Sequence, residues 1–288
     1  MNFTKALICV DFSEPSKKLI DSIPDLKKVG LKEVVFASVI NVHPADENVP
    51  FIKETYSEKR QLTLERLQEM STLAKGHDVE TKEIVSFGFT GKELLNIAVQ
   101  EQADLIVVGS HGKGVVKTIL LGSTSFELAR KSEIPVLIEK FKDVEKDQFD
   151  LVSAEKFKKV VLPVDFSQSS LKVIDFVKDK DFIKDVILVK VVARGENIEE
   201  LDKRTKEIQE KLEGIKNDLI AAGKNVEVRL KQGTPSEKIM EIAEDDGASL
   251  IMILKGGAGN IAELLIGSTA IDIARYSKVP VLLFPKFI

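Results

Sequence analysis

A short glycine-rich segment carries residue types that suit the binding of phosphate. It runs Gly109-Ser110-His111-Gly112-Lys113-Gly114, and nine residues separate Gly112 from the run Gly122-Ser123-Thr124. Glycines let backbone amides approach a ligand closely, and a helix N-terminus presents unpaired N–H groups at the positive end of its dipole. A single glycine is equally typical of a plain turn, and Ser123 or Thr124 of a helix cap. The prediction of a phosphate site therefore depends on the whole set.

An aspartate follows one apolar run, and the first of these glycines ends another. Asp11 follows Ala6-Leu7-Ile8-Cys9-Val10, and Gly109 follows Leu105-Ile106-Val107-Val108. Parallel sheets bind ligands beyond the carboxyl ends of their strands, where the strand order reverses. If the order is 3-2-1-4-5, Asp11 and Gly109 meet at that reversal. Because no second carboxylate, nucleophile or metal-binding cluster lies beside Asp11 in the sequence, we interpret it as a binding residue, and we predict no catalytic residue and no metal site.

The landmarks of this pattern occur twice in the 288 residues. Asp11-Phe12-Ser13 returns as Asp165-Phe166-Ser167, at an offset of 154, and Gly122-Ser123-Thr124 returns as Gly267-Ser268-Thr269, at an offset of 145. A period of this length matches a whole α/β domain rather than a solenoid repeat. We therefore expect two related domains in tandem.

Composition and apolar periodicity predict the limits and the architecture of these domains. We expect domains over 1–142 and 157–288, joined by a charged, solvated linker over 143–156 with the boundary near Ser153. Short β-branched runs alternate with longer amphipathic stretches, which is typical of βαβ units. Each domain is expected to be an α/β, Rossmann-like fold with a doubly wound, five-stranded parallel sheet of strand order 3-2-1-4-5. The expected strands are 5–10, 34–39, 80–85, 105–108 and 136–138, then 159–164, 186–192, 226–231, 250–253 and 281–284.

Two helix starts are expected from capping boxes. Thr90 with Glu93, and Thr234 with Glu237, have the spacing in which a threonine hydroxyl and a glutamate carboxylate satisfy free N–H groups of the first turn. We therefore expect both threonines to cap their helices.

Composition excludes several classes of function. The 42 Lys and Arg residues nearly balance the 46 Asp and Glu residues, so there is no large positive field to hold nucleic acid or an anionic membrane. The one cysteine, Cys9, lies in an apolar run and is interpreted as a small buried hydrophobe. No apolar run approaches about 18 residues and no leader is recognisable, so we expect a soluble, cytoplasmic protein. Neither the Walker pattern nor G-x-G-x-x-G is present.

The spacing Gly109-x2-Gly112-x9-Gly122-Ser123 resembles the nucleotide-binding pattern of the ATP-binding branch of the universal stress protein family. From end to end, the chain is similar to a tandem of two such domains. The resemblance implies ATP or another adenine nucleotide as ligand, with Mg²⁺ as an optional companion of ATP.

The same resemblance implies roles for individual residues of the first copy. Asp11 would lie at the adenosine end of the ligand, and the backbone at Val39 and Ile40 would border the adenine. The residues expected to contact ribose and phosphates, or to lie beside them, are Gly109, Gly112, Gly122, Ser123 and Thr124.

The second copy keeps only part of this pattern. Its weaker candidate residues, which match positions of the first copy, are Asp165, Gly257, Gly267 and Ser268. Leu254 stands where the first copy has Gly109, and Lys255 stands where it has Ser110. A leucine side chain is expected to obstruct the approach of a ligand to the backbone, although Lys255 could attract phosphate. We therefore expect the first copy to bind more tightly.

Two functions of different classes stay open. The first is a regulatory or stress-response protein that binds an adenine nucleotide in its first copy. Such a protein would hydrolyse ATP slowly at most, because no general base, metal cluster or arginine is identifiable near the glycine-rich segment. The second is a stress or signalling scaffold that binds no nucleotide and acts through protein contacts. An adenylating or nucleotidyl-transferring enzyme is disfavoured, since the sequence lacks a pyrophosphate-loop signature.

The last strand of each copy is an apolar sheet edge in the expected order. An edge of this kind, at 135–138 and at 280–284, must be paired or covered. The family resemblance implies that these strands pair the two domains as an intrachain pseudo-dimer. A homodimer of two chains stays open.

Overall fold

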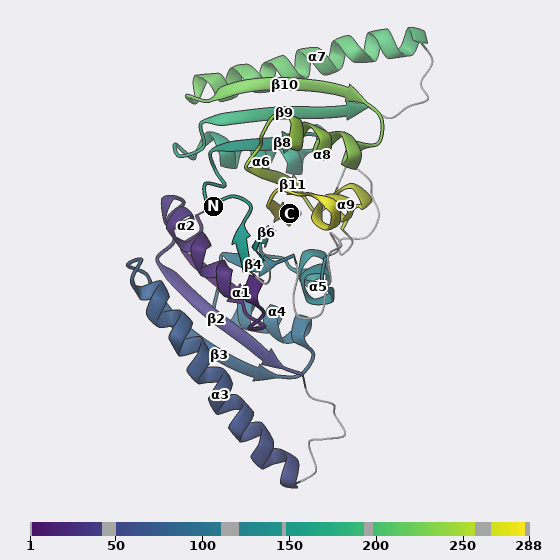
Figure 1. The fold of residues 1–288 in the computed structure, drawn as a ribbon. Helices are drawn as coiled ribbons and strands as arrows, with labels where there is room; N and C mark the ends of the chain where they lie inside the picture. The colour runs from purple at the N-terminus through teal and green to yellow at the C-terminus, as the bar shows by residue number, and fades with distance from the viewer. Residues whose placement is uncertain are drawn as a thin grey trace. The chain divides into compact units, whose positions relative to one another are not determined.

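The computed structural model describes residues 2–41, 50–110, 121–145, 148–192, 198–256 and 266–285. The chain divides into two compact units, Met1–Ala154 (unit 1) and Glu155–Ile288 (unit 2). Each unit is an α/β fold built on a parallel sheet (Figure 1).

The five parallel strands of unit 1 follow the order β3-β2-β1-β4-β5, as the apolar runs predict. On the central strand, Ile8 lies opposite Phe36 of β2 and Val107 of β4. The order reverses between β1 and β4, so the crevice of a doubly wound sheet belongs at their carboxyl ends. The strands are β1 (Lys5–Cys9), β2 (Glu33–Ile40), β3 (Glu80–Phe87), β4 (Leu105–Gly109) and β5 (Val136–Glu139).

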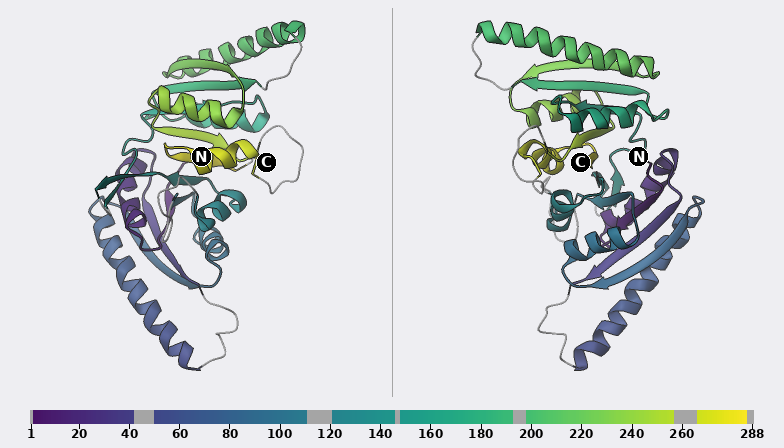
Figure 2. Two further views of the ribbon diagram at one scale, coloured as in Figure 1. Left: turned by 45° about the vertical axis from the view of Figure 1, so that its right-hand side comes forward. Right: turned by 180° about the vertical axis from the view of Figure 1, so that it is seen from behind.

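The helices of unit 1 form two groups. The 3-10 helix η1 contacts α1, α2 and α3, whereas α4 packs against α5. Right-handed crossovers in opposite directions place such groups on opposite faces of a sheet, and α3 runs alongside β3 (Figures 1 and 2). The helices are α1 (Glu14–Lys17), η1 (Lys18–Ser22), α2 (Ile23–Lys28), α3 (Pro50–Lys75), α4 (Thr90–Gln100) and α5 (Ser123–Lys131).

The two central strands of unit 1 form its core. Leu7, Ile8, Ile106 and Val107 are fully buried, as expected for strands that are covered on both faces. Cys9 is buried beside them, and burial raises the pKa of its thiol well above the ordinary value. The interpretation of Cys9 as a small buried hydrophobe is therefore confirmed.

Unit 2 repeats the same sheet, in the order β10-β9-β8-β11-β12. Here α6 contacts α7, and α8 contacts α9. The predicted order 3-2-1-4-5 is thus confirmed in both copies. The elements are β8 (Lys159–Pro163), α6 (Gln168–Lys178), β9 (Asp185–Val192), α7 (Ile198–Ala221), β10 (Asn225–Gln232), α8 (Pro235–Asp245), β11 (Leu250–Leu254), α9 (Ser268–Tyr276) and β12 (Val281–Phe284).

An antiparallel hairpin occupies much of the segment 143–156, which was expected to be a solvated linker. β6 (Phe141–Glu145) pairs with β7 (Gln148–Leu151), and β7 packs against η1 of unit 1. Leu151 is buried, and Asp150 Oδ1 lies 3.4 Å from Lys18 Nζ. The apolar residues of β7 alternate with polar ones, and this period of two gives the hairpin a face that packs on unit 1. The sequence predicted a linker because the many charged residues of this segment make the alternation hard to recognise.

The threonine caps are corrected by the structure. α4 begins at Thr90 itself, and neither its N-cap Phe89 nor Thr234, the N-cap of α8, makes a side-chain capping hydrogen bond. Glu93 instead accepts a hydrogen bond from Ser86 Oγ (3.0 Å) at the end of β3. A tertiary partner has therefore replaced the reciprocal bond of the capping box.

In each unit, a serine shortly after the first strand caps the helix that follows, α1 in unit 1 and α6 in unit 2. Ser13 Oγ accepts a hydrogen bond from Ser16 N (3.3 Å), and Ser167 Oγ accepts one from Ser170 N (3.2 Å). Both serines have extended backbone angles, as N-cap residues usually do. The repeated sequence Asp-Phe-Ser thus begins a helix in the same way in both units.

We expect Ser167→Ala to lower the free energy of unfolding by about 1 kcal/mol, because α6 loses its cap. Thr234→Ala should change that free energy by less than about 0.5 kcal/mol, since no capping hydrogen bond is lost. Urea denaturation of the two variants tests this difference. Equal losses would show that Thr234 does cap α8.

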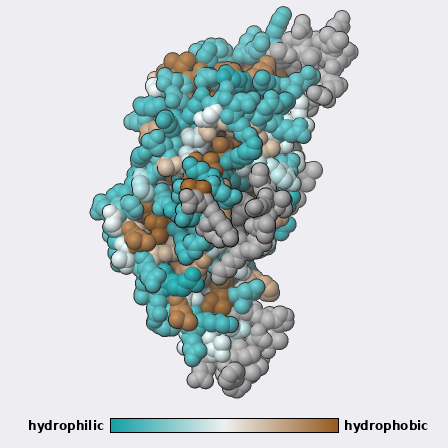
Figure 3. Space-filling model, viewed as in Figure 1, coloured by the Kyte–Doolittle hydropathy of each residue, from teal (hydrophilic) through white to brown (hydrophobic). Residues whose placement is uncertain are grey.

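The surface visible in Figure 3 is mostly hydrophilic, with scattered apolar residues. Among the helices of the described ranges, none has the length and apolar character needed to cross a membrane.

Candidate functional site

A tight turn after β1 holds Asp11 at the carboxyl edge of the sheet of unit 1. Asp11 Oδ1 accepts hydrogen bonds from Ser13 N (2.9 Å) and Ser13 Oγ (2.6 Å). Between these residues Phe12 has a φ of +59°, in the left-handed region. Aspartates that bond to the backbone two residues on are typical of such turns. The exposed carboxylate of Asp11 is thus held beside the end of β1.

On β4, the strand next to β1, the last residues of the strand contact the start of α5. Gly109 is the last residue of β4 and is buried. Gly122, the N-cap of α5, donates from its N–H to Ser110 O at 3.0 Å. Because β4 pairs with β1, the structure brings Asp11, Gly109 and Gly122 to one edge of the sheet.

The other predicted residues of the first copy lie around this edge where they are described. Ser123, the first residue of α5, is exposed, and Thr124 is half-buried. Ile40 ends β2, and its carbonyl accepts a hydrogen bond from Gly88 N (3.1 Å). Gly112 lies outside the described residues.

Neither the backbone nor the described packing requires a glycine at position 122. Its φ of −60° suits any residue. An added Cβ would meet nothing closer than Ser110 O at 3.8 Å and Ser125 Oγ at 3.9 Å among the described atoms, which are ordinary van der Waals distances. The missing side chain therefore leaves room beside the first amides of α5.

Ser125 is a residue at this edge that the sequence analysis missed. It is buried, and its Oγ donates to Gly109 O at 2.7 Å, which ties the first turn of α5 to the last residue of β4. The repeat offset of 145 places Ala270 at the equivalent position in unit 2, and alanine has no hydroxyl to make this bond. A serine in the first turn of a helix carries no local signal, so only comparison of the two copies could have found it.

Unit 2 repeats the aspartate turn in a less exposed form. Asp165 Oδ1 accepts a hydrogen bond from Ser167 N (2.9 Å), and Phe166 has a φ of +65°. Burial favours a higher pKa for Asp165, but hydrogen bonds from Ser167 and Ser170 and the charge of Lys190 outweigh it and lower the pKa below the ordinary value. Asp165 is therefore held ionised.

The edge between β11 and α9 in unit 2 has the same backbone and different side chains. Gly267, the N-cap of α9, donates from its N–H to Lys255 O at 2.6 Å, and Ser268 is the exposed first residue of the helix. Leu254 and Lys255 are both buried. The structure thus keeps the helix start but places two large side chains at this edge. Gly257 lies outside the described residues.

A cation lies over the phenylalanine of each turn. Arg66 Cζ of α3 is 4.0 Å from the centre of the Phe12 ring. In unit 2, Lys211 Nζ of α7 and Lys190 Nζ of β9 are 5.5 Å and 4.9 Å from the centre of the Phe166 ring. These separations are within the range of cation–π attraction. The sequence analysis missed all three cations.

A buried contact next to Gly109 differs in chemistry between the units. Glu139, fully buried at the end of β5 and opposite Gly109, accepts a hydrogen bond from Ser22 Oγ (2.6 Å). The equivalent residues of unit 2, by the repeat offsets, are Phe176 and Phe284, whose rings pack edge to face with centres 5.3 Å apart. One unit thus uses a polar contact where the other uses an aromatic one.

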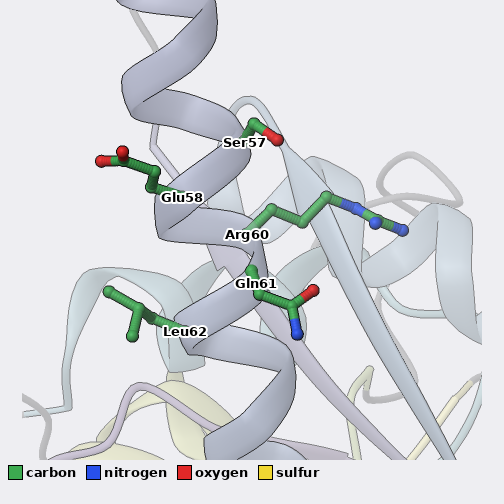
Figure 4. Close-up of a pocket in the computed structure, with 5 residues that line it drawn as sticks. All are labelled: Ser57, Glu58, Arg60, Gln61 and Leu62. Atoms are coloured by element: carbon green, nitrogen blue, oxygen red, sulfur yellow. The ribbon is translucent and has the colours of Figure 1, made fainter.

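One shallow hollow of the described surface lies on α3 (Figure 4). Its lining residues, all from less than two turns of that helix, are Ser57, Glu58, Arg60, Gln61 and Leu62. A hollow lined by one helix cannot enclose a ligand, so it is not the candidate site. The described residues contain no group of three or more metal-ligating side chains.

Comparisons with known proteins agree with this architecture. The model of the universal stress protein family matches residues 2–140 and again 156–285. Universal stress protein MJ0577 of Methanocaldococcus jannaschii is 31% identical over 157 residues, covering 49% of this chain and 97% of that protein. Universal stress protein YxiE of Bacillus subtilis is 32% identical over 147 residues, covering 47% of this chain and 98% of that protein.

A solved structure of a universal stress protein from Archaeoglobus fulgidus covers 99% of this chain and 97% of its own, with a TM-score of 0.73 and 26% identity. The match therefore extends over both units. Together with the two matches of the family model, it shows that the chain belongs to the universal stress protein family and carries two of its domains in tandem.

Proposed function

We propose that unit 1 binds an adenine nucleotide such as ATP and serves a regulatory or stress-response role in the cytoplasm. The observation that carries this proposal is the start of α5. Its N-cap Gly122 lies against the end of β4, and an added Cβ would meet the nearest described atoms, Ser110 O and Ser125 Oγ, only at van der Waals distances. A helix N-terminus of this kind attracts phosphate through its free N–H groups and its dipole.

Each part of the ligand has a proposed partner. The backbone around Gly109, Gly112 and Gly122, with Ser123 and Thr124, would bind the phosphates and the ribose. The carboxylate of Asp11 suits a hydrogen bond from a ribose hydroxyl, because an ionised carboxylate only accepts. The backbone at Ile40 would border the adenine. Family membership supports these assignments.

We further propose that unit 2 binds the same nucleotide more weakly. Leu254 and Lys255 are buried side chains where unit 1 has Gly109 and Ser110. They leave less room for backbone contact with phosphates, even though Gly267 and Asp165 repeat their counterparts. Apolar β5 and β12 support the proposal that the tandem domains form an intrachain pseudo-dimer, since an apolar edge needs a partner.

Identification of a co-purified ligand tests the proposal directly. The purified chain is denatured, the released small molecules are identified by mass spectrometry, and the ligand-free chain is then titrated calorimetrically with ATP, ADP, AMP and GTP, with and without Mg²⁺. We expect adenine nucleotides to bind more tightly than GTP. A folded chain that releases none and binds none would contradict nucleotide binding and favour the scaffold that acts through protein contacts.

We expect any ATP hydrolysis to be far slower than the turnover of about 10 per second that is typical of enzymes. Of the two carboxylates described at this edge, that of Glu139 is buried against Ser22, and that of Asp11 is held by Ser13 and is assigned above to the ribose, so neither is assigned as a general base. Release of phosphate from ATP by the purified chain measures this rate. A turnover in the ordinary enzyme range that is lost in Asp11→Asn would make Asp11 a catalytic residue.

A further inference from the structure

A bulky residue adopts the left-handed backbone region at the same place in both units. Phe12 and Phe166 have φ values of +59° and +65°, and each directly follows the aspartate in the turn after the first strand of its unit. This region favours glycine or asparagine, and large side chains occupy it only where their surroundings enforce it. Such strain at two equivalent positions indicates that the aromatic ring itself is needed there.

The long helix of each unit supplies a cation to that ring from an equivalent position. Arg66 of α3 lies over Phe12, and Lys211 of α7 lies over Phe166. The positions 66 and 211 are related by 145, the offset that relates Gly122 to Gly267. The residue type differs between the copies while the cation–π contact is kept. The contact, rather than the arginine itself, is therefore the common feature.

This contact bears directly on the orientation of Asp11. Phe12 lies between Asp11 and Ser13, which are joined by the two hydrogen bonds to Asp11 Oδ1. Relaxation of Phe12 from its left-handed angle would rotate the peptide groups on both sides and separate these partners. The Arg66 guanidinium opposes that relaxation, since it attracts the ring in its present position.

We propose that Arg66 is a positioning residue for nucleotide binding, which acts through Phe12 to hold the Asp11 turn in its binding conformation. This inference rests on the proposed function of unit 1. Lys211 and Phe166 form the corresponding pair in unit 2. Arg66 is exposed and its guanidinium lies over the Phe12 ring, so it links α3 to the turn that holds Asp11.

Three variants of the full chain separate this role from general effects. Arg66→Met removes the charge and keeps an apolar stem, whereas Arg66→Lys copies the cation of the second unit. Arg60→Met is the matched control, because Arg60 is another exposed arginine of α3 and lines the shallow hollow. Hydrogen exchange of the Ser13 and Ser16 amides, measured by NMR, reports on the turn without any ligand. Calorimetric titration with ATP reports on binding.

We expect Arg66→Met to speed exchange of both amides and to weaken ATP binding, each by about twofold to fivefold, the range set by one exposed cation–π contact. Arg66→Lys should restore both values, and Arg60→Met should leave both unchanged. Unchanged exchange in Arg66→Met overturns the proposal, and so does faster exchange with unchanged affinity. A wild-type chain that binds no ATP overturns the proposed function and the binding role together, while exchange still decides whether Arg66 holds the turn.

Discussion

Gly122→Ala is expected to weaken the binding of ATP to the full chain by about 10-fold to 100-fold, or about 1.4 to 2.7 kcal/mol. The added methyl group would fit the ligand-free chain, since its nearest described neighbours are Ser110 O at 3.8 Å and Ser125 Oγ at 3.9 Å. It would instead occupy the space through which a phosphate approaches the first amides of α5. Calorimetric titration measures the loss.

Two further alanine variants are controls for this result. Gly267→Ala makes the same change at the N-cap of α9, so it carries the same small capping cost but should leave the tighter site of unit 1 intact. Gly214→Ala adds a methyl group in open space on α7 and should not affect binding. Unchanged affinity in folded Gly122→Ala would show that the phosphates do not bind at α5. Equal losses in Gly122→Ala and Gly267→Ala would contradict unequal binding by the units.

Lys140→Met is expected to raise the free energy of unfolding at pH 7 by about 3 kcal/mol. Lys140 follows β5 and is only 3% exposed. Burial disfavours its charged form and lowers the pKa of its amine from 10.5 to about 8. At pH 7 the amine is still protonated, so the folded chain bears the cost of burial that the lowered pKa reflects, and methionine removes that cost.

The same lowered pKa predicts how stability depends on pH. Between pH 8 and 10.5 the unfolded chain holds more protons on Lys140 than the folded chain does, so stability rises with pH through this window. Urea denaturation at pH 7, 8, 9 and 10.5 should show this rise in the wild type and a smaller one in Lys140→Met. Lys142→Met, which changes an exposed lysine of β6, is the control and should follow the wild type. A loss of stability in Lys140→Met would show that the amine is stabilised by its partners.

The sheets were predictable because their central strands are continuous apolar runs with clear ends. β1, β4, β8 and β11 are buried almost throughout, and the repeat showed where the pattern restarts. The hairpin of β6 and β7 was not predictable from composition, since its apolar contacts are spaced among many charges. The capping box at Thr90 failed for a different reason, because Glu93 bonds to Ser86 in the preceding strand rather than to its own helix.

The sequence predicted those parts of the site in which a residue's role depends only on its neighbours along the chain. Spacing indicated that Gly122 and Gly267 begin helices, and the structure makes each the N-cap of its helix. Asp11 and Asp165 were expected at the ends of strands, and the structure places each two residues beyond its strand, in the turn that follows. The positive φ of Phe12 and the cation above it depend on contact between elements that are distant in the chain. No local pattern contains that information. It emerges when equivalent positions of the two copies are compared in three dimensions.

The polar pair of unit 1 and the aromatic pair of unit 2 limit how the two halves of the gene can recombine. Repeated sequences invite exchange between copies, but swapping the last strands would bury a glutamate against Phe176 and a benzyl group against Ser22. The first combination leaves a carboxylate without its hydroxyl donor, and the second puts a phenylalanine into a space that fits a glutamate. Chains produced by such an exchange would fold poorly and be removed by selection. The two halves can therefore keep diverging, and each can acquire a ligand preference of its own.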